Sequence, residues 1–468
     1  MFFRSFFDEN LAHMSYLIGC QRTGEAIIID PSRHLDMYKQ TAEKEGLTII
    51  AVTETHIHAD FVSGSREAAS QFDATLYLSD EGDENWKYQY VEDAKHILLK
   101  DESTFTIGFV EFQVMHTPGH TPESISFLLT DKGSGSTEPM GIFSGDFVFV
   151  GDIGRPDLLE KAAGVKGTAD AGARQMFHSL KRFKALPDYL QVWPAHGAGS
   201  ACGKALGAVP VSTVGYEKIN NWALQIDNEE EFVAALLNGQ PEPPIYFAMM
   251  KKVNKLGPEY VKCTPIKDLS SVKELEQFGS EKVLIDTRSA KEFALSHIKG
   301  SLNIPYNQSM TNWAGWLIDY NQDIVLITQE KDVDSIRKAL ASIGLDRVIA
   351  KIDPVIVLKE TSRLESYGEI DVHQLEKLLN DGQYHLIDVR NQSEWEEGRI
   401  ELAQHIMLGT LKDRLSEIPQ GKKYIVQCRS GTRSAIAASI LQANGFKDVF
   451  NLIGGYIAWT KEQLPVLK

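Results

Sequence analysis

Two stretches of the sequence hold the residue types that can carry chemistry. In the first, residues 53–64 read TETHIHADFVSG, so two histidines and an aspartate stand close together. Three more residues of these kinds stand at or just after the ends of strand-like runs further along the chain. Imidazole nitrogens and carboxylate oxygens are common ligands of transition metals. The sequence therefore predicts a metal site drawn from His56, His58, Asp60, His116, Asp146 and His196.

The second stretch, QCRSGTRSAIAASIL at 427–441, places Cys428 between a short β-run and a helix. Gly431 allows the connecting loop to curl so that its N–H groups face inward, and the helix adds its positive end. Such a loop stabilises an anion, either a thiolate or a persulfide. Cys428 is the predicted nucleophile, and the predicted anion-binding loop is Arg429, Ser430, Gly431, Thr432 and Arg433.

Strand-like runs in the first part of the chain would position the histidines. EAIIIDPSR (25–33) and LTIIAVTETH (47–56) read as buried strands, and the second delivers His56 at its end. FVEFQVMHTPGHT (109–121) alternates and then breaks at Pro118 and Gly119. Residues 125–149 predict a hairpin with GSGST at its tip and Asp146 just past its second strand. KLGPEYVKCTP (255–265) predicts a linker.

The rest of the chain contains an internal repeat. KVLIDTRSAKEFALSHIKGSLNIP (282–305) matches YHLIDVRNQSEWEEGRIELAQHIM (384–407), and DIVLIT (323–328) matches KYIVQC (423–428). Each copy continues into an amphipathic helix, at 335–344 and at 434–445. This alternation predicts two small α/β domains with parallel sheets. In the first copy Thr328 stands at the position of Cys428, and QEKDVD follows it.

The bulk composition limits the classes of function. At 468 residues the chain should hold about three domains, and its 43% apolar and 24% charged residues are those of a globular protein. A net charge of −16 argues against a general nucleic-acid binder. The N-terminus, MFFRSFFDEN, does not resemble a signal peptide, and no apolar run is long enough to span a membrane. We expect a cytoplasmic protein whose four cysteines are thiols.

The order and the flanks of the metal-site residues resemble the metallo-β-lactamase superfamily, in its glyoxalase II and persulfide dioxygenase branch. FVGDIGRPDLL (149–159) is particularly similar to persulfide dioxygenases. The resemblance covers about the first 250 residues and implies an αββα sandwich. It assigns the metal to His56, His116 and Asp146. In the two-zinc hydrolases of this superfamily a histidine at position 61 helps to hold a second metal, but this chain has Phe61.

The resemblance therefore implies one mononuclear Fe(II) held by two imidazoles and a carboxylate, the pattern of non-haem oxygenases. His58, Asp60 and His196 would orient ligands or substrate, with His58 left open as a fourth ligand. His120 is interpreted as structural, at the end of a Pro-Gly turn. Arg155 has two open interpretations: it pairs with an anionic group of the substrate, or it forms a structural salt bridge.

CRSGTR, with LIDVRNQSEWEEG before it and NLIGGYIAW after it, resembles the rhodanese sulfurtransferases. In that family the loop cysteine carries a transferable sulfane sulfur, which implies this role for Cys428. A threonine hydroxyl cannot carry sulfane sulfur, so the first copy is expected to be a degenerate rhodanese with a scaffold or docking role. The expected domains are a metallo-β-lactamase-fold domain at 1–258, a degenerate rhodanese at 259–360 and an active rhodanese at 361–468.

Cys202 stands six residues after His196 in the Gly-rich loop HGAGSACGK. Two interpretations stay open. The thiol lies near the mouth of the metal pocket and relays sulfur there, or it is a small buried residue in a tight loop. Cys20 and Cys263 receive no role.

As a whole the chain resembles fused persulfide dioxygenase–rhodanese proteins of bacterial sulfide detoxification. The expected partners are a low-molecular-weight persulfide, O₂ and sulfite or thiosulfate, with no nucleic acid and no membrane. The oligomeric state stays open, a homo-oligomer included. Two other functions are also open: a thioester hydrolase like glyoxalase II, and a non-catalytic sulfur-binding or redox-sensing module.

Overall fold

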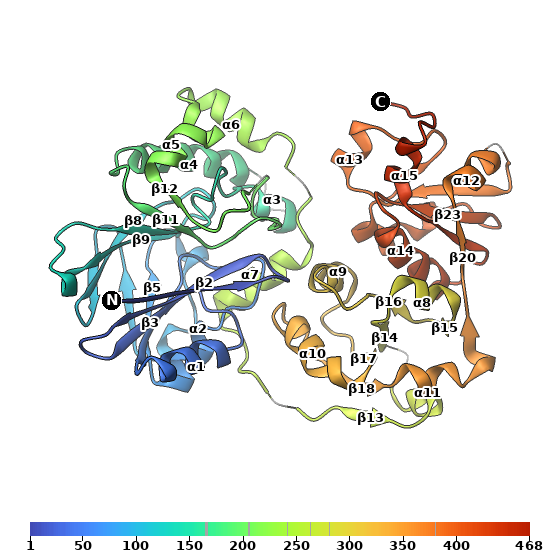
Figure 1. The fold of residues 1–468 in the computed structure, drawn as a ribbon, viewed down its shortest axis with the longest axis horizontal. Helices are drawn as coiled ribbons and strands as arrows, with labels where there is room; N and C mark the ends of the chain where they lie inside the picture. Colours follow the sequence, from blue (N-terminus) through green and yellow to red (C-terminus); the bar gives the residue numbers. More distant parts are fainter. Residues whose placement is uncertain (164–166, 205, 241, 263, 280, 380) are drawn as a thin grey trace. The chain divides into compact units, whose positions relative to one another are not determined.

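The computed structural model describes residues 1–163, 167–204, 206–240, 242–262, 264–279, 281–379 and 381–468. It divides into two compact units (Figure 1). Unit 1 comprises Met1–Lys262 with Ala341–Gly344, and unit 2 comprises Cys263–Leu340 with Leu345–Lys468. Among the described residues, every helix is too short or too polar to cross a lipid bilayer.

Unit 1 is built on two six-stranded sheets. The first has the order β1-β2-β3-β4-β5-β6: β1 (Phe2–Asp8), β2 (His13–Cys20), β3 (Glu25–Ile29), β4 (Thr48–Thr53), β5 (Thr75–Ser79) and β6 (His96–Leu99). The second has the order β12-β11-β10-β9-β8-β7: β7 (Thr104–Ile107), β8 (Val110–His116), β9 (Ile125–Asp131), β10 (Gly141–Gly145), β11 (Gln191–Pro194) and β12 (Ser212–Thr213). The expected hairpin at 125–149 is present, because β9 and β10 pair antiparallel.

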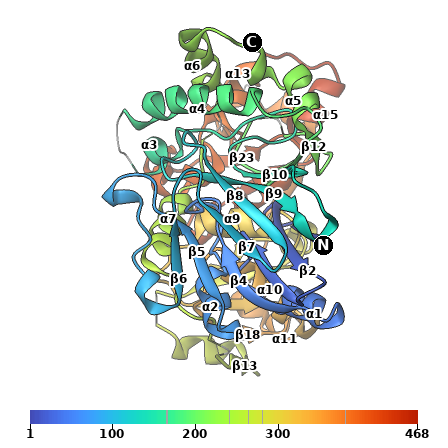
Figure 2. The same ribbon diagram turned by 90° about the vertical axis from the view of Figure 1, so that its left-hand side faces the viewer.

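Helices cover the outer faces of both sheets (Figure 2). One side carries α1 (Asp36–Lys44) and α2 (Ser65–Phe72); the other carries α4 (Thr168–Lys184), α5 (Val214–Asn220) and α6 (Glu229–Leu237). Two further helices, α3 (Leu158–Ala163) and α7 (Tyr246–Leu256), complete the unit. A cluster of aromatic and aliphatic side chains, including Tyr16, Phe112 and Phe143, fills the space between the sheets. Because β2 has a sheet on one face and helices on the other, all of its residues are buried. Unit 1 is therefore an αββα sandwich.

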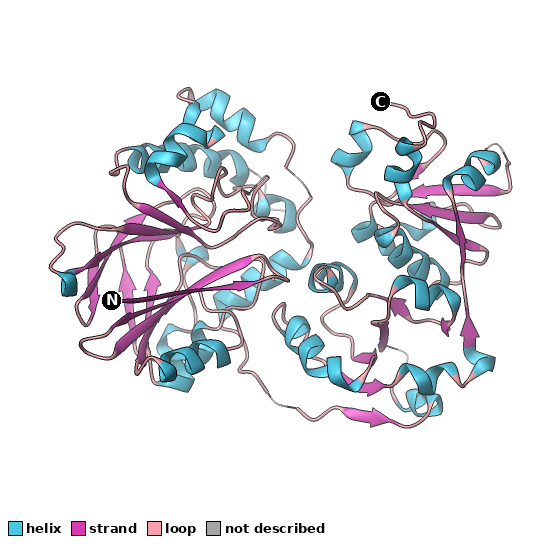
Figure 3. Ribbon diagram, viewed as in Figure 1, coloured by secondary structure: helices cyan, strands magenta, loops and turns pink. Residues whose placement is uncertain are grey.

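Unit 2 contains the predicted repeat as two parallel sheets of five strands (Figure 3). The first has the order β13-β18-β17-β14-β16: β13 (Lys267–Leu269), β14 (Val283–Asp286), β16 (Leu302–Asn303), β17 (Ile324–Ile327) and β18 (Val348–Ile352). The second has the order β20-β24-β23-β21-β22: β20 (Gly368–Ile370), β21 (Tyr384–Asp388), β22 (Gln404–His405), β23 (Lys423–Gln427) and β24 (Val449–Leu452). The strand orders correspond position by position. The prediction of two related α/β domains is confirmed.

Helices surround each of these sheets. The first domain has α8 (Ala290–Leu295), α9 (Met310–Leu317), α10 (Val333–Ala341) and α11 (Pro354–Leu358). The second has α12 (Val372–Leu378), α13 (Gln392–Glu397), α14 (Thr432–Ala443) and α15 (Gly455–Lys461). A short pair, β15 (His297–Ile298) with β19 (Leu364–Glu365), joins the domains.

The helix α14 is buried on every side along Ser434–Leu441. Part of its cover comes from the first domain of unit 2, where the N–H of Asn303 in β16 donates to Ser439 Oγ at 3.0 Å. Nearby, Gly409 packs against the ring of Trp316 in α9, and any larger residue at 409 would overlap this ring. The two α/β domains of unit 2 thus pack against each other along α14.

Each sheet of unit 2 has an ion pair at the end of the strand beside its central strand, Arg288 with Asp286 after β14 and Arg390 with Asp388 after β21. In the second domain the guanidinium of Arg390 reaches Asp388 at 2.7 Å, and the two side chains are 2% and 0% exposed. The same guanidinium donates to the carbonyls of Glu394 and Gly398. The end of β21 is therefore tied to α13. This helix in turn holds the Cys428 loop, because Glu394 pairs with Arg433.

Arg390→Met tests this tie. The substitution leaves the buried Asp388 carboxylate without its ion-pair partner and with only the backbone N–H of residue 390 beside it, which should cost about 3–5 kcal/mol. Resistance of residues 364–468 to proteolysis across a urea series should collapse at lower urea than in the wild type. Arg414→Met is the matched control, because its partner Glu417 is at the surface. Equal loss of protection in both variants would contradict the assignment.

Candidate metal and sulfur sites

The metal-site residues follow the ends of four strands that come from both sheets of unit 1. His56 follows β4, His120 follows β8, Asp146 follows β10 and His196 follows β11. Gly145 has φ of 55° and no space for a side chain, because Thr55 lies against it. This contact brings the end of β10 directly against the His56 loop. Residues far apart in sequence thereby share one buried pocket.

His56, His120 and Asp146 form one group whose ligand atoms all lie within 4.8 Å of one another. Nε2 of His56 lies 3.8 Å, and Nε2 of His120 3.5 Å, from Asp146 Oδ2. His56 Nε2 and both carboxylate oxygens of Asp146 are buried without a hydrogen-bond partner. Such atoms are costly unless a ligand satisfies them. Their chemistry fits a divalent transition metal.

The sequence expectation is corrected at one ligand. His116 lies at the end of β8, its Nε2 is 2.9 Å from the carbonyl of Pro122, and it takes no part in this group. His120, which we interpreted as structural, lies in this group beside His56 and Asp146. The Thr-Pro-Gly segment after His116 turns the chain, and this turn carries His120 into the pocket.

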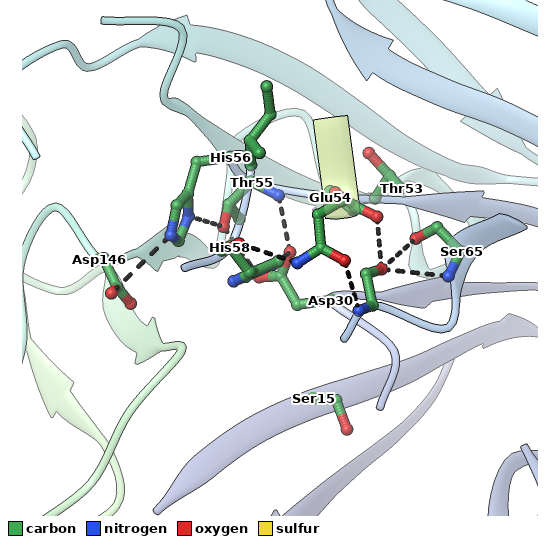
Figure 4. A network of polar contacts seen from close by, with 12 residues as sticks. Ser15, Asp30, Thr53, Glu54, Thr55, His56, His58, Ser65 and Asp146 are labelled. Atoms are coloured by element: carbon green, nitrogen blue, oxygen red, sulfur yellow. Dashed lines mark hydrogen bonds and ion pairs between the residues drawn. The ribbon is translucent and has the colours of Figure 1, made fainter. Parts of the chain in front are cut away.

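Hydrogen bonds on the outer side fix the orientation of both imidazoles. His120 Nδ1 lies 3.0 Å from the carbonyl of Arg155, which can only accept, so Nδ1 carries the proton. His56 Nδ1 lies 3.0 Å from Thr55 Oγ1, whose own proton goes to Asp30 at 2.9 Å (Figure 4). In both rings Nε2 is left as the bare nitrogen that faces Asp146. Burial lowers the pKa of His120 to about 4, which keeps this ring neutral.

His58 is not a member of this group, although its ring centroid is 4.2 Å from that of His56. Its Nε2 is 3.0 Å from Asp30 Oδ1 (Figure 4). Burial opposes a charge on the ring, but the Asp30 carboxylate outweighs it and raises the pKa of His58 to about 9. Its Nδ1 is buried without a hydrogen-bond partner among the described residues. Through Asp30 and Thr55 it is connected to His56 by hydrogen bonds.

Asp60, His196 and Cys202 form a second group, again with ligand atoms within 4.8 Å of one another. His196 Nε2 lies 3.2 Å from Asp60 Oδ2 and 3.4 Å from Asp146 Oδ1. Its Nδ1 lies 3.2 Å from the carbonyl of Ala12, so its bare nitrogen also faces inward. The two groups thus meet at the Asp146 carboxylate.

Phe61 lies in an aromatic layer beside this second group. Its ring centroid is 4.0 Å from that of His13 and 4.5 Å from that of His58, and the side chain is fully buried. Burial raises the pKa of Asp60 and of Asp146 to about 6. Burial, followed by the Asp146 carboxylate, also raises the pKa of the Cys202 thiol. The pocket is therefore an environment that favours a bound cation over free anions.

Arg155 forms the structural salt bridge, one of the two alternatives left open by the sequence. Its guanidinium makes two hydrogen bonds of 2.7 Å to Asp157, and the side chain is fully buried. Its backbone N–H donates to the carbonyl of Cys202 at 3.1 Å, and its own carbonyl holds His120. The backbone of Arg155 thus connects His120 of the first group to Cys202.

Sequence reasoning missed three residues that shape the pocket. Asp30 and Thr55 orient His56. Asn254 in α7 holds the loop that follows His56. The Asn254 amide donates to the carbonyls of His58 and Phe61 at 2.8 and 2.7 Å and accepts from Ser63 N–H at 2.9 Å. A polar residue in a helix far along the chain gives no local signal for this role. The DPSR turn at Asp30 was the only visible hint.

The sulfur site is a loop between β23 and α14. Cys428 is fully buried, and its Sγ accepts a hydrogen bond from the Gly431 N–H at 3.1 Å and from Ser434 Oγ at 3.4 Å. Gly431 has φ of 100° and precedes the first turn of α14. The sulfur thus lies at the positive end of a helix, as the sequence predicted.

The rest of the loop is held by neighbouring elements. Arg433 makes a two-pronged ion pair with Glu394 in α13, at 2.6 and 2.7 Å. The N–H of Tyr456 at the start of α15 donates to the Cys428 carbonyl at 2.7 Å. A side chain at Gly455 would overlap this carbonyl, which explains the GGY sequence. Arg429 is exposed and faces solvent beside the loop.

The equivalent position in the first rhodanese-like domain lacks these features. Thr328 is buried, and the residues after it form a short helical turn, Glu330–Asp332, that carries acids. Lys351 pairs with Glu330 and with Asp268. Among the described cysteines, Cys20, Cys202 and Cys428 are free thiols. Cys263 lies outside the described residues.

Comparison with known proteins gives two family matches. The metallo-beta-lactamase superfamily model matches residues 9–196, and the rhodanese-like domain model matches residues 270–359 and 371–462. A solved metallo-beta-lactamase structure from Staphylococcus aureus subsp. aureus COL is 45% identical, with a TM-score of 0.69, and the match covers 75% of this chain and 99% of that one.

Two curated proteins match separate parts of the chain. A sulfurtransferase of Allochromatium vinosum is 37% identical over 101 residues, which are 21% of this chain and 94% of that protein. A hydroxyacylglutathione hydrolase of Gloeobacter violaceus is 33% identical over 172 residues, which are 36% of this chain and 58% of that protein.

Thr55→Val tests the hydrogen-bond chain that orients His56. The substitution keeps the shape but removes the hydroxyl between Asp30 and the imidazole. Loss of such an outer partner should weaken metal binding by about 10–100-fold. Competition with a chromophoric chelator measures the affinity.

Thr53→Val is the control, because the Thr53 hydroxyl bonds only to the Tyr77 carbonyl in β5. Equal affinities in the two variants would show that the Thr55 hydroxyl does not orient His56.

Proposed function

Because the chain belongs to the metallo-β-lactamase superfamily and carries two rhodanese-like domains after that domain, we propose that it is a non-haem iron persulfide dioxygenase coupled to a sulfurtransferase. Its substrate would be a low-molecular-weight persulfide and its final product thiosulfate, in cytoplasmic sulfide detoxification. One observation carries the proposal: a two-histidine, one-carboxylate group and a cysteine loop suited to sulfane sulfur occur in one chain.

The residues that would hold the iron are His56, His120 and Asp146. When bound there, Fe(II) would bind a persulfide sulfur and O₂ and would supply the redox chemistry between them. The chain's own contribution is to present two bare Nε2 atoms and a carboxylate in a buried pocket. Arg155 and Thr55 hold the imidazoles, and Phe61 helps to exclude water.

The net oxidation is balanced without a further reductant. A persulfide RSSH, O₂ and water give the thiol RSH, sulfite and two protons. The terminal sulfur is oxidised and dioxygen is reduced, so both oxygen atoms and the oxygen of the water end in sulfite. The products leave the thiol carrier ready to accept sulfur again.

Cys428 would perform the second reaction. Its thiolate takes the terminal sulfur from another persulfide and releases RSH, which leaves a Cys428 persulfide. Sulfite then attacks the outer sulfur, the S–S bond breaks and the Cys428 thiolate leaves, so that thiosulfate is formed. Gly431 N–H, Ser434 and the start of α14 stabilise the anionic sulfur in both steps.

The first rhodanese-like domain would not transfer sulfur. Thr328 cannot carry a sulfane sulfur, and the acids that follow would repel sulfite. Its proposed role is structural, because β16 and α9 cover the second domain at Ser439 and Gly409.

A thioester hydrolase similar to hydroxyacylglutathione hydrolases is the second candidate. The match to such a hydrolase over the first part of the chain favours it. It would use a metal-bound hydroxide and would not need Cys428. Hydrolysis of a glutathione thioester by the zinc-loaded protein, with no oxygen consumption by the iron-loaded protein, would favour this candidate.

Oxygen uptake by the Fe(II)-loaded protein on addition of glutathione persulfide tests the dioxygenase. We expect rapid uptake in the wild type and at least a hundredfold loss in His120→Ala, because one of three ligands is removed. His116→Ala is the matched control and should keep most of the activity. Equal loss in both variants would contradict the ligand assignment, and no uptake in the wild type would overturn the proposed oxidation.

Cys428→Ser tests the division of labour between the two sites. Oxygen uptake should stay near that of the wild type, while sulfite accumulates in place of thiosulfate. Ion chromatography of the products measures both anions. Cys20→Ser, which changes a free thiol in β2, is the control and should still yield thiosulfate. Thiosulfate from Cys428→Ser at the normal rate would show that sulfur transfer occurs elsewhere.

A further inference from the structure

A cavity opens in the second domain of unit 2, away from Cys428. Its volume is about 310 Å³, near the lower limit of the pockets that hold small molecules. It lies between α12, the first residues of β21 and the turn before β22. Because β21 and β23 run parallel, their first residues lie at one edge of the sheet, and Cys428 follows the opposite edge. The reactions proposed above make no use of this cavity.

The walls of the cavity are mainly apolar. Leu375 and Leu378 come from α12, and Leu386 and Ile425 are cross-strand neighbours in β21 and β23. The ring of Tyr384, the first residue of β21, completes this side. Such walls favour an apolar ligand over water.

Two polar side chains of the lining already have partners within the chain. Asp381 Oδ1 accepts a hydrogen bond from the Gln383 N–H at 3.0 Å. His385 Nε2 lies 2.7 Å from Gln404 Oε1. These groups therefore need no polar ligand inside the cavity.

Leu402, at the rim of the cavity, has a strained backbone. Its φ is 69°, in the left-handed region that leucine rarely adopts, and the residue is 64% exposed. A side chain that is mostly in solvent gains little from packing in the folded domain. Strain of this kind is a reason to look for a function of the side chain.

The first copy of the repeat shows what this turn requires. Gly300 stands at the position of Leu402, with φ of 82°. The turns are the same, because the N–H of Ser301 donates to the carbonyl of Ile298 and residue 403 donates to residue 400. Glycine adopts this conformation without strain. The second copy thus has a leucine where the turn alone favours glycine, and this leucine lines the cavity.

Two lysines place positive charge beside the cavity. Lys422 Nζ donates to the carbonyl of Gly382, and Lys423 Nζ lies 5.3 Å from the ring centroid of Tyr384. Gly382 and Tyr384 are both lining residues. Among the described residues, neither ammonium forms an ion pair with a carboxylate, and Asp381 is the single acid of the lining. The net charge at this wall favours an anionic group.

We propose that this cavity binds a medium-chain carboxylic acid, with the alkyl chain against the leucines and the carboxylate beside Lys422 and Lys423. The apolar walls select the chain, and the two ammonium groups select a carboxylate over a neutral or cationic head group. The small volume favours a chain of medium length. A ligand that binds only the folded domain also stabilises it. The proposal goes beyond the sulfur chemistry proposed above and does not rest on it.

Calorimetric titration of the full-length protein with sodium octanoate tests the proposal. We expect saturable binding of one octanoate per chain and weaker binding of 1-octanol, which has the same chain without the charge. Octanoate should also raise the urea concentration at which residues 364–468 become sensitive to proteolysis. Uptake that does not saturate, or equal affinity for octanoate and 1-octanol, would overturn the proposal.

Leu402→Gly separates binding from folding. Without ligand, residues 364–468 should resist proteolysis in urea at least as well as in the wild type, because the strain is relieved. The affinity for octanoate should fall about tenfold, since one apolar wall is lost. Leu295→Gly, which removes a leucine of the first domain that is 74% exposed, is the control and should bind as the wild type. Unchanged affinity in Leu402→Gly would contradict the proposed site.

Reversal of the two lysine charges tests the choice of an anion. Lys422→Glu combined with Lys423→Glu should lower the affinity for octanoate about tenfold or more and leave that for 1-octanol near the wild-type value. Lys359→Glu, at an exposed lysine of the first domain, is the control. An equal change for both ligands in the double variant would show that the lysines do not select a carboxylate.

A different occupant would give a different result. If the wild type binds no octanoate but forms dimers that Leu402→Gly dissociates, a second copy of this chain covers the cavity and the proposal is wrong. Oxygen uptake and thiosulfate formation are measured separately. Failure of the proposed sulfur chemistry would therefore leave the octanoate result unchanged.

Discussion

The pocket of unit 1 depends on hydrogen bonds that its histidines make on their outer sides. His56, His120 and His196 each have Nδ1 against an oxygen, from Thr55, Arg155 and Ala12 respectively. Because these bonds fix the tautomer and the ring plane, three bare nitrogens converge on Asp146 before any ligand arrives. The sandwich supplies the rigid strand ends from which these loops start. Every chemical proposal for this half of the chain rests on that pre-orientation.

The sequence predicted which loops would form this pocket more reliably than which side chains would face it. Strand ends can be located by hydrophobic runs, so the loops after β4, β8, β10 and β11 were expected to meet. His116 ends β8 and His120 lies in the loop after it, and the sequence does not reveal which of the two side chains faces the pocket. The turn at Pro118 and Gly119 decides it. Asn254 and Asp30 were missed because their contacts join segments that the sequence separates widely.

The second half of the chain was easier to predict for a physical reason. Its site is local: strand, loop and helix are consecutive, so Cys428, Gly431 and the start of α14 are neighbours in sequence and in space. The repeat also helped, because matching segments of the two copies predict the same strands and the same helix. What the sequence did not reveal is the tie from Arg433 to Glu394, which links the loop to a helix outside the motif.

The burial of α14 along Ser434–Leu441 bears on how this chain can be divided. A helix that is covered on one side by its own sheet and on another by Asn303 and its neighbours belongs to two domains at once. The Cys428 domain is therefore not a self-contained cassette, since removing the first copy would expose apolar helix surface to water. The first copy, which has Thr328 in place of the cysteine, is therefore part of the structure on which the Cys428 site rests.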